Sequence, residues 1–418
     1  MTSTDPTSGG RRRRTARWLA PLLALVVIGV LLVTSRPDGE RDRACTPPRP
    51  TGWVQDARMT SEFSRYGNDN LRFDDWTGGD GTRSVRLPDG RTLWLSADTF
   101  LDRVYEGGRR VPSPKWVRNS VLVMNPSGTL ERTLVEGDAQ NPRPLFASGF
   151  SPEGRELWRW PVQAVVEPRT PGSPDKVVRV LLWQREQGTA PWIFGVPRLS
   201  EVATLSLPDL KLQDIRPLHR PSDNTPFDRR VLYGTSAVQQ GEWTYVFGAD
   251  EGSVDGKASR AHVARVPRGQ LAASSAWRYW DGKEWQGNPT RSRAILVGRT
   301  AQRGATGTYS VVRAKDGWLL LTMDAGAPDG GGMDTLTSYS SCSPTGPWSG
   351  PVKVAKPPLP PGGARAGAVP YNPQAHPEFT DDRGRLLVSY DVNVLGSTEG
   401  IHRDVNLYRP RFLRLDVR

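Results

Sequence analysis

Residues 84–95 read SVRLPDGRTLWL, in which Asp89-Gly90 stands between two segments with a strand-like pattern. Apolar and polar residues alternate before the turn, and aliphatic and aromatic residues are enriched after it. An Asp-Gly pair between such segments is the strongest short-range signal for a β-hairpin. We therefore predict two antiparallel strands joined by a tight turn.

The same pattern occurs four more times along the chain. The further copies lie at residues 163–183, 236–247, 310–321 and 377–390. Their turn glycines recur about every 70 residues, and each interval has room for two more strands. One unit of four strands cannot bury its own faces, but five units packed radially can. The sequence predicts an all-β fold, a five-bladed β-propeller over residues 53–418; a pair of β-sandwiches is the alternative, although it would not need this period.

The composition agrees with a fold of short strands and many turns. The 418 residues include 43 Gly, 37 Pro and 15 Trp, a combination that excludes a helical bundle or a coiled coil. The net charge of +12 fits either an arginine-rich solvated surface or attraction to an anionic polymer. Because the sequence has no basic helix and no aromatic RNA-binding signature, we do not expect nucleic acid as a partner.

The N-terminus has the features of an export segment. Residues 1–17 end in a cluster of arginines, and residues 18–34 carry no charge. As a helix, residues 18–34 would span roughly 25 Å, the short end of a membrane span. We predict a cytoplasmic basic tail (1–17), a single transmembrane signal anchor (18–34), a linker (35–52) and an extracellular propeller. A cleaved signal peptide, which would release a secreted protein, is the alternative.

The two cysteines predict a disulfide bond, because an exported chain folds in an oxidising compartment. A bond between Cys45 and Cys342 would close a loop of about 300 residues and stabilise the fold by up to roughly 5 kcal/mol in the chain-entropy model. Two unpaired thiols are the alternative.

Four scattered histidines and two cysteines give little support to a metal site, so we expect no cofactor, although a calcium ion in the channel remains an alternative.

Two aspartates flank the first hairpin. Asp80 precedes Gly90 by ten residues and Asp98 follows it by eight, so both should lie at the same end of the hairpin. Two carboxylates at one mouth of a propeller channel suit glycoside hydrolysis. Amides of the glycines between 78 and 81 should keep Asp80 ionised as nucleophile or electrostatic partner. The apolar run before Asp98 should raise its pKa and suit it to general-acid work; the alternative is that both aspartates only cap turns.

These residues carry a resemblance to a known family. The segments WTGGDG (76–81), ADTF (97–100) and NSVLV (119–123) resemble the first blade of a secreted actinobacterial propeller family that includes endo-D-arabinanases. Further matching segments lie at 233–236, 343–348, 375–378 and 408–412. The essential aspartates of that family match Asp80 and Asp98, although Ala97 stands where the family usually has glycine. The resemblance implies hydrolysis of a cell-wall polysaccharide, such as a D-arabinofuranoside polymer.

Polar and aromatic residues near the expected channel are candidates for substrate binding. Trp76 could offer a ring face to a sugar, and His376 and Glu378 should begin the inner strand of the fifth blade. Asn119 and Ser236 are similar candidates. The alternative for the polar residues is a buried network that plugs the channel. We expect a monomer at the cell membrane whose partner is a wall polysaccharide. One alternative function is a non-catalytic propeller that binds a glycan or a protein. Another is a structural wall protein.

Overall fold

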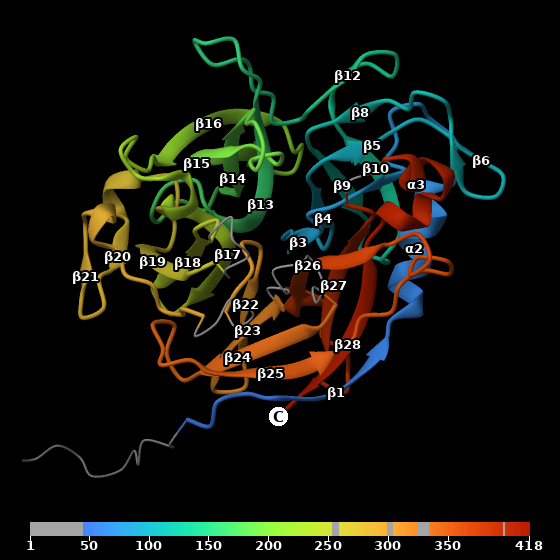
Figure 1. Cartoon of the computed structure of the whole chain (residues 1–418). Helices are drawn as coiled ribbons and strands as arrows, with labels where there is room; N and C mark the ends of the chain where they lie inside the picture. The colour runs from blue at the N-terminus through green and yellow to red at the C-terminus, as the bar shows by residue number, and fades with distance from the viewer. Residues whose placement is uncertain (1–44, 253–258, 299–303, 325–333, 396–397) are drawn as a thin grey trace, which may run out of the picture. The chain divides into compact units, whose positions relative to one another are not determined.

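The computed structural model describes residues 45–252, 259–298, 304–324, 334–395 and 398–418. Residues from Thr46 onward form one compact unit, which is almost entirely β (Figure 1). The predicted membrane segment 18–34 lies outside the described residues. Within the described part of the chain, no helix is long and apolar enough to cross a membrane. The all-β prediction is confirmed.

Five antiparallel sheets of four or five strands follow one another along the chain. The first sheet contains β3 (Arg83–Arg86), β4 (Thr92–Ser96), β9 (Ser120–Met124) and β10 (Leu130–Leu134). The second contains β13 (Leu157–Pro168), β14 (Lys176–Glu186), β15 (Val196–Ser206) and β16 (Leu212–His219). The third contains β17 (Leu232–Gln240), β18 (Trp243–Ala249), β19 (Ala261–Pro267), β20 (Arg278–Trp280) and β21 (Trp285–Gln286).

The last two sheets have four strands each. The fourth contains β22 (Ser310–Ala314), β23 (Gly317–Met323), β24 (Leu336–Ser341) and β25 (Ser349–Ala355). The fifth contains β26 (Val369–His376), β27 (Leu386–Asn393), β28 (Arg411–Val417) and β1 (Pro50–Gln55). The last sheet therefore combines the two ends of the compact unit, with Trp53 of β1 opposite Leu415 of β28. Residues 50–52, which the sequence assigns to the linker, belong to this closing strand.

Shorter elements connect the sheets. The minor strands are β2 (Gly78–Gly79), β5 (Thr99–Phe100), β6 (Val104–Tyr105), β7 (Arg109–Arg110), β8 (Trp116–Val117), β11 (Glu136–Gly137) and β12 (Pro142–Arg143). The helices are α2 (Ala57–Gly67), α3 (Glu399–Arg403), η1 (Phe227–Arg229), η2 (Ser274–Ala276), η3 (Pro289–Arg291), η4 (Pro377–Phe379) and η5 (Val405–Tyr408). The side chain of Asp56 caps α2 by accepting the Met59 amide at 2.8 Å.

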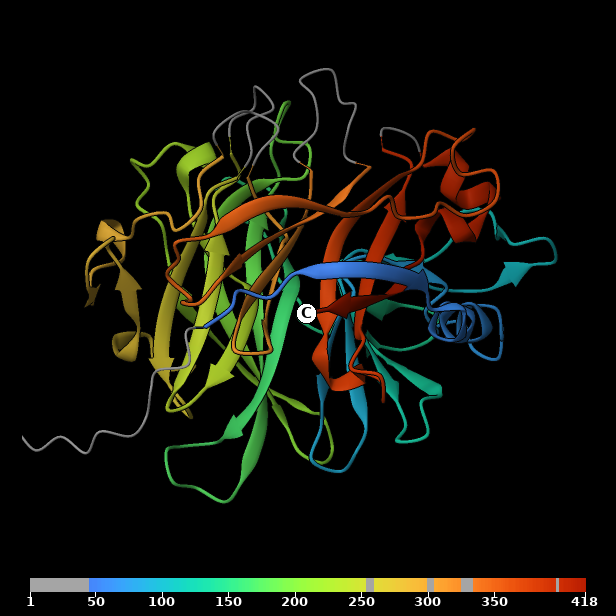
Figure 2. The same cartoon turned by 90° about the horizontal axis from the view of Figure 1, so that it is seen from below.

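The five sheets form a closed ring. Their first strands, β3, β13, β17, β22 and β26, each contact the next, and β26 contacts β3 (Figure 1). The core of the described residues consists of five apolar clusters, each shared by two neighbouring sheets. Figure 2 views the ring from the side, with the green β13–β14 hairpin turn at its lower edge.

Cys45 and Cys342 are disulfide-bonded, which confirms the disulfide predicted from the sequence.

The fifth hairpin differs from the prediction. Its first strand, β26, begins at Val369 and ends at His376, whereas the sequence analysis placed the start of this strand at His376 and Glu378. Pro377 opens the 3-10 turn η4, a position that tolerates proline because its backbone needs no N–H donor. Eight residues of strand span about 25 Å, so this error moves both side chains to the opposite end of the ring.

Candidate functional site

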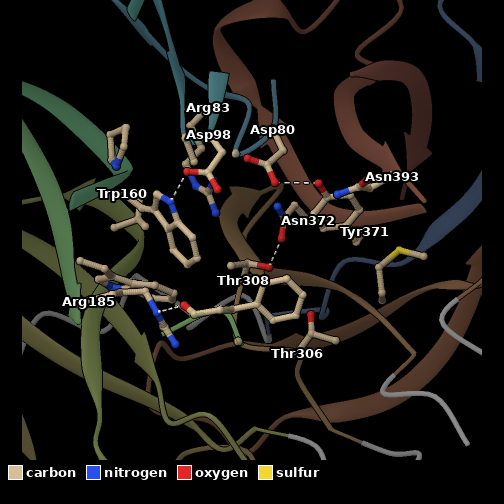
Figure 3. A pocket seen from close by; sticks show the side chains of 18 of the residues that line it. Asp80, Arg83, Asp98, Trp160, Arg185, Thr306, Thr308, Tyr371, Asn372 and Asn393 are labelled. Atoms are coloured by element: carbon tan, nitrogen blue, oxygen red, sulfur yellow. Dashed lines mark hydrogen bonds between the residues drawn. The ribbon is translucent and has the colours of Figure 1, made fainter. Parts of the chain in front are cut away.

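A cavity of about 480 Å³ lies at the end of the ring where the first strands begin (Figure 3). Side chains from four of the sheets and from the loops between them line it. The polar and aromatic lining residues include Asp80, Arg83, Asp98, Trp160, Trp183, Arg185, Phe194, Glu251, Thr306, Thr308, Tyr371, Asn372, Asn393 and Tyr408. The cavity therefore combines carboxyl groups with aromatic walls, as many ligand sites do.

Asp80 and Asp98 both line this cavity. They lie just outside the two ends of the β3–β4 hairpin, where the amide of Ala97 donates to the carbonyl oxygen of Asp80 at 2.7 Å. The Ser96 hydroxyl donates to the same carbonyl at 3.2 Å. Gly81 has a φ of +71°, and a Cβ there would lie 3.0 Å from the Ala97 Cβ, so this position requires glycine. Local hydrogen bonds and a close approach thus hold the two aspartates side by side.

Asp80 bonds a neutral hydroxyl and lies near other acidic side chains, and the buried guanidinium of Arg83 also interacts with it electrostatically. The Tyr371 hydroxyl donates to its Oδ2 at 2.6 Å. Burial raises the pKa of Asp80 well above its usual range, and the nearby carboxyl groups of Asp391 and Asp98 raise it further. The surroundings of Asp80 therefore favour its protonated form.

Asp98 differs because it forms an ion pair. Nη1 of Arg118 lies 3.5 Å from its Oδ2, and the indole Nε1 of Trp160 donates to its Oδ1 at 3.1 Å. Burial raises the pKa of Asp98, but Arg118 and Trp160 oppose this effect. The Asp98 side chain is also 30% exposed, so it retains contact with water. The two carboxyl groups face one cavity in unequal environments.

Arg118 is itself held in place. Its Nε and Nη2 donate to the carboxylate of Glu156 at 2.9 and 2.8 Å. Its guanidinium also lies over the rings of Trp116 and Trp158, with distances of 4.7 and 4.3 Å to the ring centroids. These contacts fix the positive charge beside Asp98.

Asp391 is a third acidic residue, which the sequence analysis missed. It lies in β27, is fully buried, and accepts hydrogen bonds from the Gly81 amide at 2.6 Å and the Thr82 hydroxyl at 2.8 Å. The sequence analysis assigned the glycine amides to Asp80, but the Gly81 amide donates to Asp391 instead. Asp391 therefore anchors the turn that carries Asp80. The single acid within the apolar strand LLVSYDVN was the available signal.

None of the five predicted substrate-binding residues lines the cavity. Trp76 is buried and packs edge-on against Phe63, with ring centroids 5.7 Å apart. The Asn119 side chain bonds the backbone of Phe146. The Ser236 hydroxyl donates to the Val311 carbonyl at 2.9 Å and accepts its amide at 3.0 Å. The last two residues connect neighbouring segments, so their contacts are structural.

His376 and Glu378 lie at the far end of the ring. Glu378 and Ser84 line a second cavity of about 390 Å³, and the Ser84 hydroxyl donates to the Glu378 carboxylate. The two nitrogens of His376 lie 2.5 Å from Ser84 Oγ and 2.8 Å from Ser389 Oγ. Burial lowers the pKa of His376 to about 3, so it is neutral. Ser84, His376, Glu378 and Ser389 therefore form a polar network at this end of the ring, away from Asp80 and Asp98.

The cavity's other side chains come from distant parts of the chain. Tyr371 lies in β26, Trp160 in β13 and Arg185 in β14, and the sequence analysis singled out none of them. Among the described residues, no group of three or more His, Cys, Asp and Glu side chains is placed to hold a metal ion.

Comparisons with solved structures place the fold among known proteins. A "putative hydrolase" from Bacteroides ovatus shares the fold at a TM-score of 0.63 and 17% identity, over 87% of this chain and 90% of that one. A GH43_1 enzyme from Xanthomonas citri has a TM-score of 0.44 and 12% identity, over 86% of this chain and 94% of that one. A glycoside hydrolase family 43 arabinoxylan arabinofuranohydrolase from Bacillus subtilis has a TM-score of 0.43 and 13% identity, over 84% of this chain and 65% of that one. Scores as low as the last two do not establish a shared fold.

The chain has no match among curated proteins. One family model matches residues 61–417, a span that includes both aspartates of the cavity and all five first strands. Its description is a domain of unknown function (DUF5005). Because the match covers most of the chain, the protein belongs to this DUF5005 family.

Proposed function

We propose that the protein is a glycoside hydrolase whose five sheets are the blades of a five-bladed β-propeller. The observation that supports this most is the pair Asp80 and Asp98, which face one cavity in unequal environments. Glycosidic cleavage needs one carboxyl group that gives a proton to the leaving oxygen. It needs a second that is ionised and attacks the anomeric carbon or activates water.

The environments suggest the roles. Asp80, whose pKa is raised by burial and by the neighbouring carboxyl groups, gives its proton to the glycosidic oxygen as the bond to the anomeric carbon breaks. Asp98, beside Arg118, supplies the carboxylate. This assignment is the reverse of the one drawn from the sequence. The Tyr371 hydroxyl, which donates to Asp80, stabilises the carboxylate that Asp80 becomes after the proton leaves.

The substrate class follows from the cavity and from the sequence resemblance. Trp160, Trp183 and Tyr371 provide ring faces for a sugar. The resemblance to a family with endo-D-arabinanases favours a wall polysaccharide, in particular a D-arabinofuranoside polymer.

We also propose that residues 18–34 tether the protein to the membrane, with the compact unit outside the cell. Protease added to intact cells should then digest the compact unit, and its survival until lysis would reject this placement.

The test is incubation of the purified full-length protein with D-arabinan, arabinogalactan and xylan, followed by analysis of released oligosaccharides. We expect cleavage of at least one glycan. Binding of a glycan without any cleavage would refute the hydrolase and support the non-catalytic binding alternative. A protein that neither cuts nor binds any of them would refute both.

A further inference from the structure

Exposed apolar side chains gather at one edge of the cavity. The loop between β14 and β15 carries Trp192, Ile193 and Phe194, and the latter two are 69% and 57% exposed. The ring of Phe227, in η1, meets Trp192 edge-on at 5.7 Å between centroids. We name Trp192, Ile193, Phe194 and Phe227 the rim patch. Phe194 also lines the cavity that holds Asp80 and Asp98, so the rim patch and the cavity are continuous.

Buried contacts hold this loop in place. The guanidinium of Arg185 donates to the carbonyls of Phe194 at 2.8 Å and Gly195 at 2.7 Å. It also bonds Glu251 at 2.8 Å and lies over the Trp160 ring, 5.2 Å from its centroid. Arg185 is only 3% exposed, so its guanidinium is shielded from water. The same side chain thus links the loop to the indole that donates to Asp98.

The backbone at the end of the loop packs closely as well. Gly195 has a φ of +80°, and a Cβ there would lie 2.4 Å from the Trp158 ring. The loop therefore rests directly on Trp158, and only glycine allows this approach. The rim patch is exposed on a fixed backbone, which avoids much of the ordering cost of binding.

We infer that the rim patch binds the sugar units of a polysaccharide that adjoin the unit held in the cavity. This inference rests on the proposed function. Clusters of exposed apolar side chains mark interaction sites, and rings offer flat faces to the C–H groups of sugars. A molecule that reaches Asp80 across this edge passes over Phe194, and a polymer can occupy the cavity and the rim patch together. A monosaccharide would fill the cavity alone, so the structure favours a polymeric substrate.

The experiment is native electrophoresis of the full-length protein in gels that contain D-arabinan, arabinogalactan or xylan. The test variant is Trp192→Ala/Phe194→Ala. The matched control is Tyr105→Ala, because Tyr105 is a 46% exposed aromatic residue in β6, outside both the cavity and the rim patch. Asp80→Asn separates binding from catalysis. We expect at least one glycan to retard the wild type, the control and Asp80→Asn, and to bind the double variant at least about fivefold more weakly.

Equal retardation of the double variant and the wild type would overturn the inference, as would a wild type that no glycan retards. Retardation without cleavage would refute the hydrolase but leave the polymer-binding rim patch standing. If the double variant does not fold, Ile193→Ser and Phe194→Ala replace it, because both side chains are mostly exposed. Thermal unfolding of each variant checks that its fold is retained.

Discussion

Replacing Arg118 by methionine should distinguish the roles that we propose for Asp80 and Asp98. The substitution removes the positive charge 3.5 Å from Asp98 and keeps an apolar side chain between Trp116 and Trp158. At an effective dielectric constant of 20, two unit charges at that distance attract by about 5 kcal/mol. Because both side chains are partly exposed, water reduces this to about 2 kcal/mol.

The sign of the effect follows from linkage. Arg118 stabilises the ionised form of Asp98, so its loss makes Asp98 hold its proton to higher pH. If Asp98 must be ionised, activity is lost as the pH falls through its pKa. The acid limb of the kcat/KM profile should then move upward by at least about one pH unit.

The assay is the pH dependence of kcat/KM for the wild type and Arg118→Met on a glycan that the wild type cuts. Since the substitution also leaves Glu156 without its partner, Arg118→Met/Glu156→Gln serves as the control for that second charge. An unchanged acid limb together with an alkaline limb that moves upward would refute the assignment, because that result identifies Asp98 as the proton donor.

Three further predictions concern the scaffold. Peptide mapping without reduction should find Cys45 joined to Cys342, and reduction should lower the free energy of unfolding by up to roughly 5 kcal/mol; free thiols in the native protein would contradict this. Gly81→Ala should cost roughly 1–2 kcal/mol of stability and reduce kcat, because the alanine would adopt a positive φ against Ala97; a wild-type melting curve and rate would refute it. Ser236→Ala should lower the free energy of unfolding by about 1–3 kcal/mol in a denaturant titration and leave glycan binding unchanged, because the Ser236 hydroxyl bonds the backbone of Val311. Weaker glycan binding with unchanged stability would show instead that Ser236 contacts the glycan.

The parts of the site that depend on local sequence could be predicted. Asp80 and Asp98 flank one hairpin, and the Asp-Gly turn sets which residues lie at its open end. Tyr371 and Asp391 could not be found in this way, because they belong to the fifth sheet. They reach Asp80 only when β26 contacts β3 and the ring closes. Sequence spacing carries no information about such contacts between distant sheets.

The errors also have physical causes. Pro377 was assigned to a strand, but it opens a 3-10 turn, and this shift placed His376 and Glu378 at the wrong end of the ring. Trp76 and Asn119 were expected to bind a sugar because of their residue types. The structure instead uses one as a core aromatic and the other to bond a neighbouring backbone. For a large aromatic or an amide, residue type alone does not distinguish burial from ligand binding.

The most direct test of the proposed catalytic pair is the rate of glycan cleavage by Asp80→Asn and Asp98→Asn. Asp89→Asn is the matched control, because Asp89 lies in the distal turn of the same hairpin and bonds Arg91. We predict that each of the first two substitutions abolishes cleavage and leaves thermal unfolding and glycan retardation nearly unchanged, whereas Asp89→Asn retains wild-type cleavage. Wild-type turnover by both Asp80→Asn and Asp98→Asn on a glycan that the protein cuts would contradict the account.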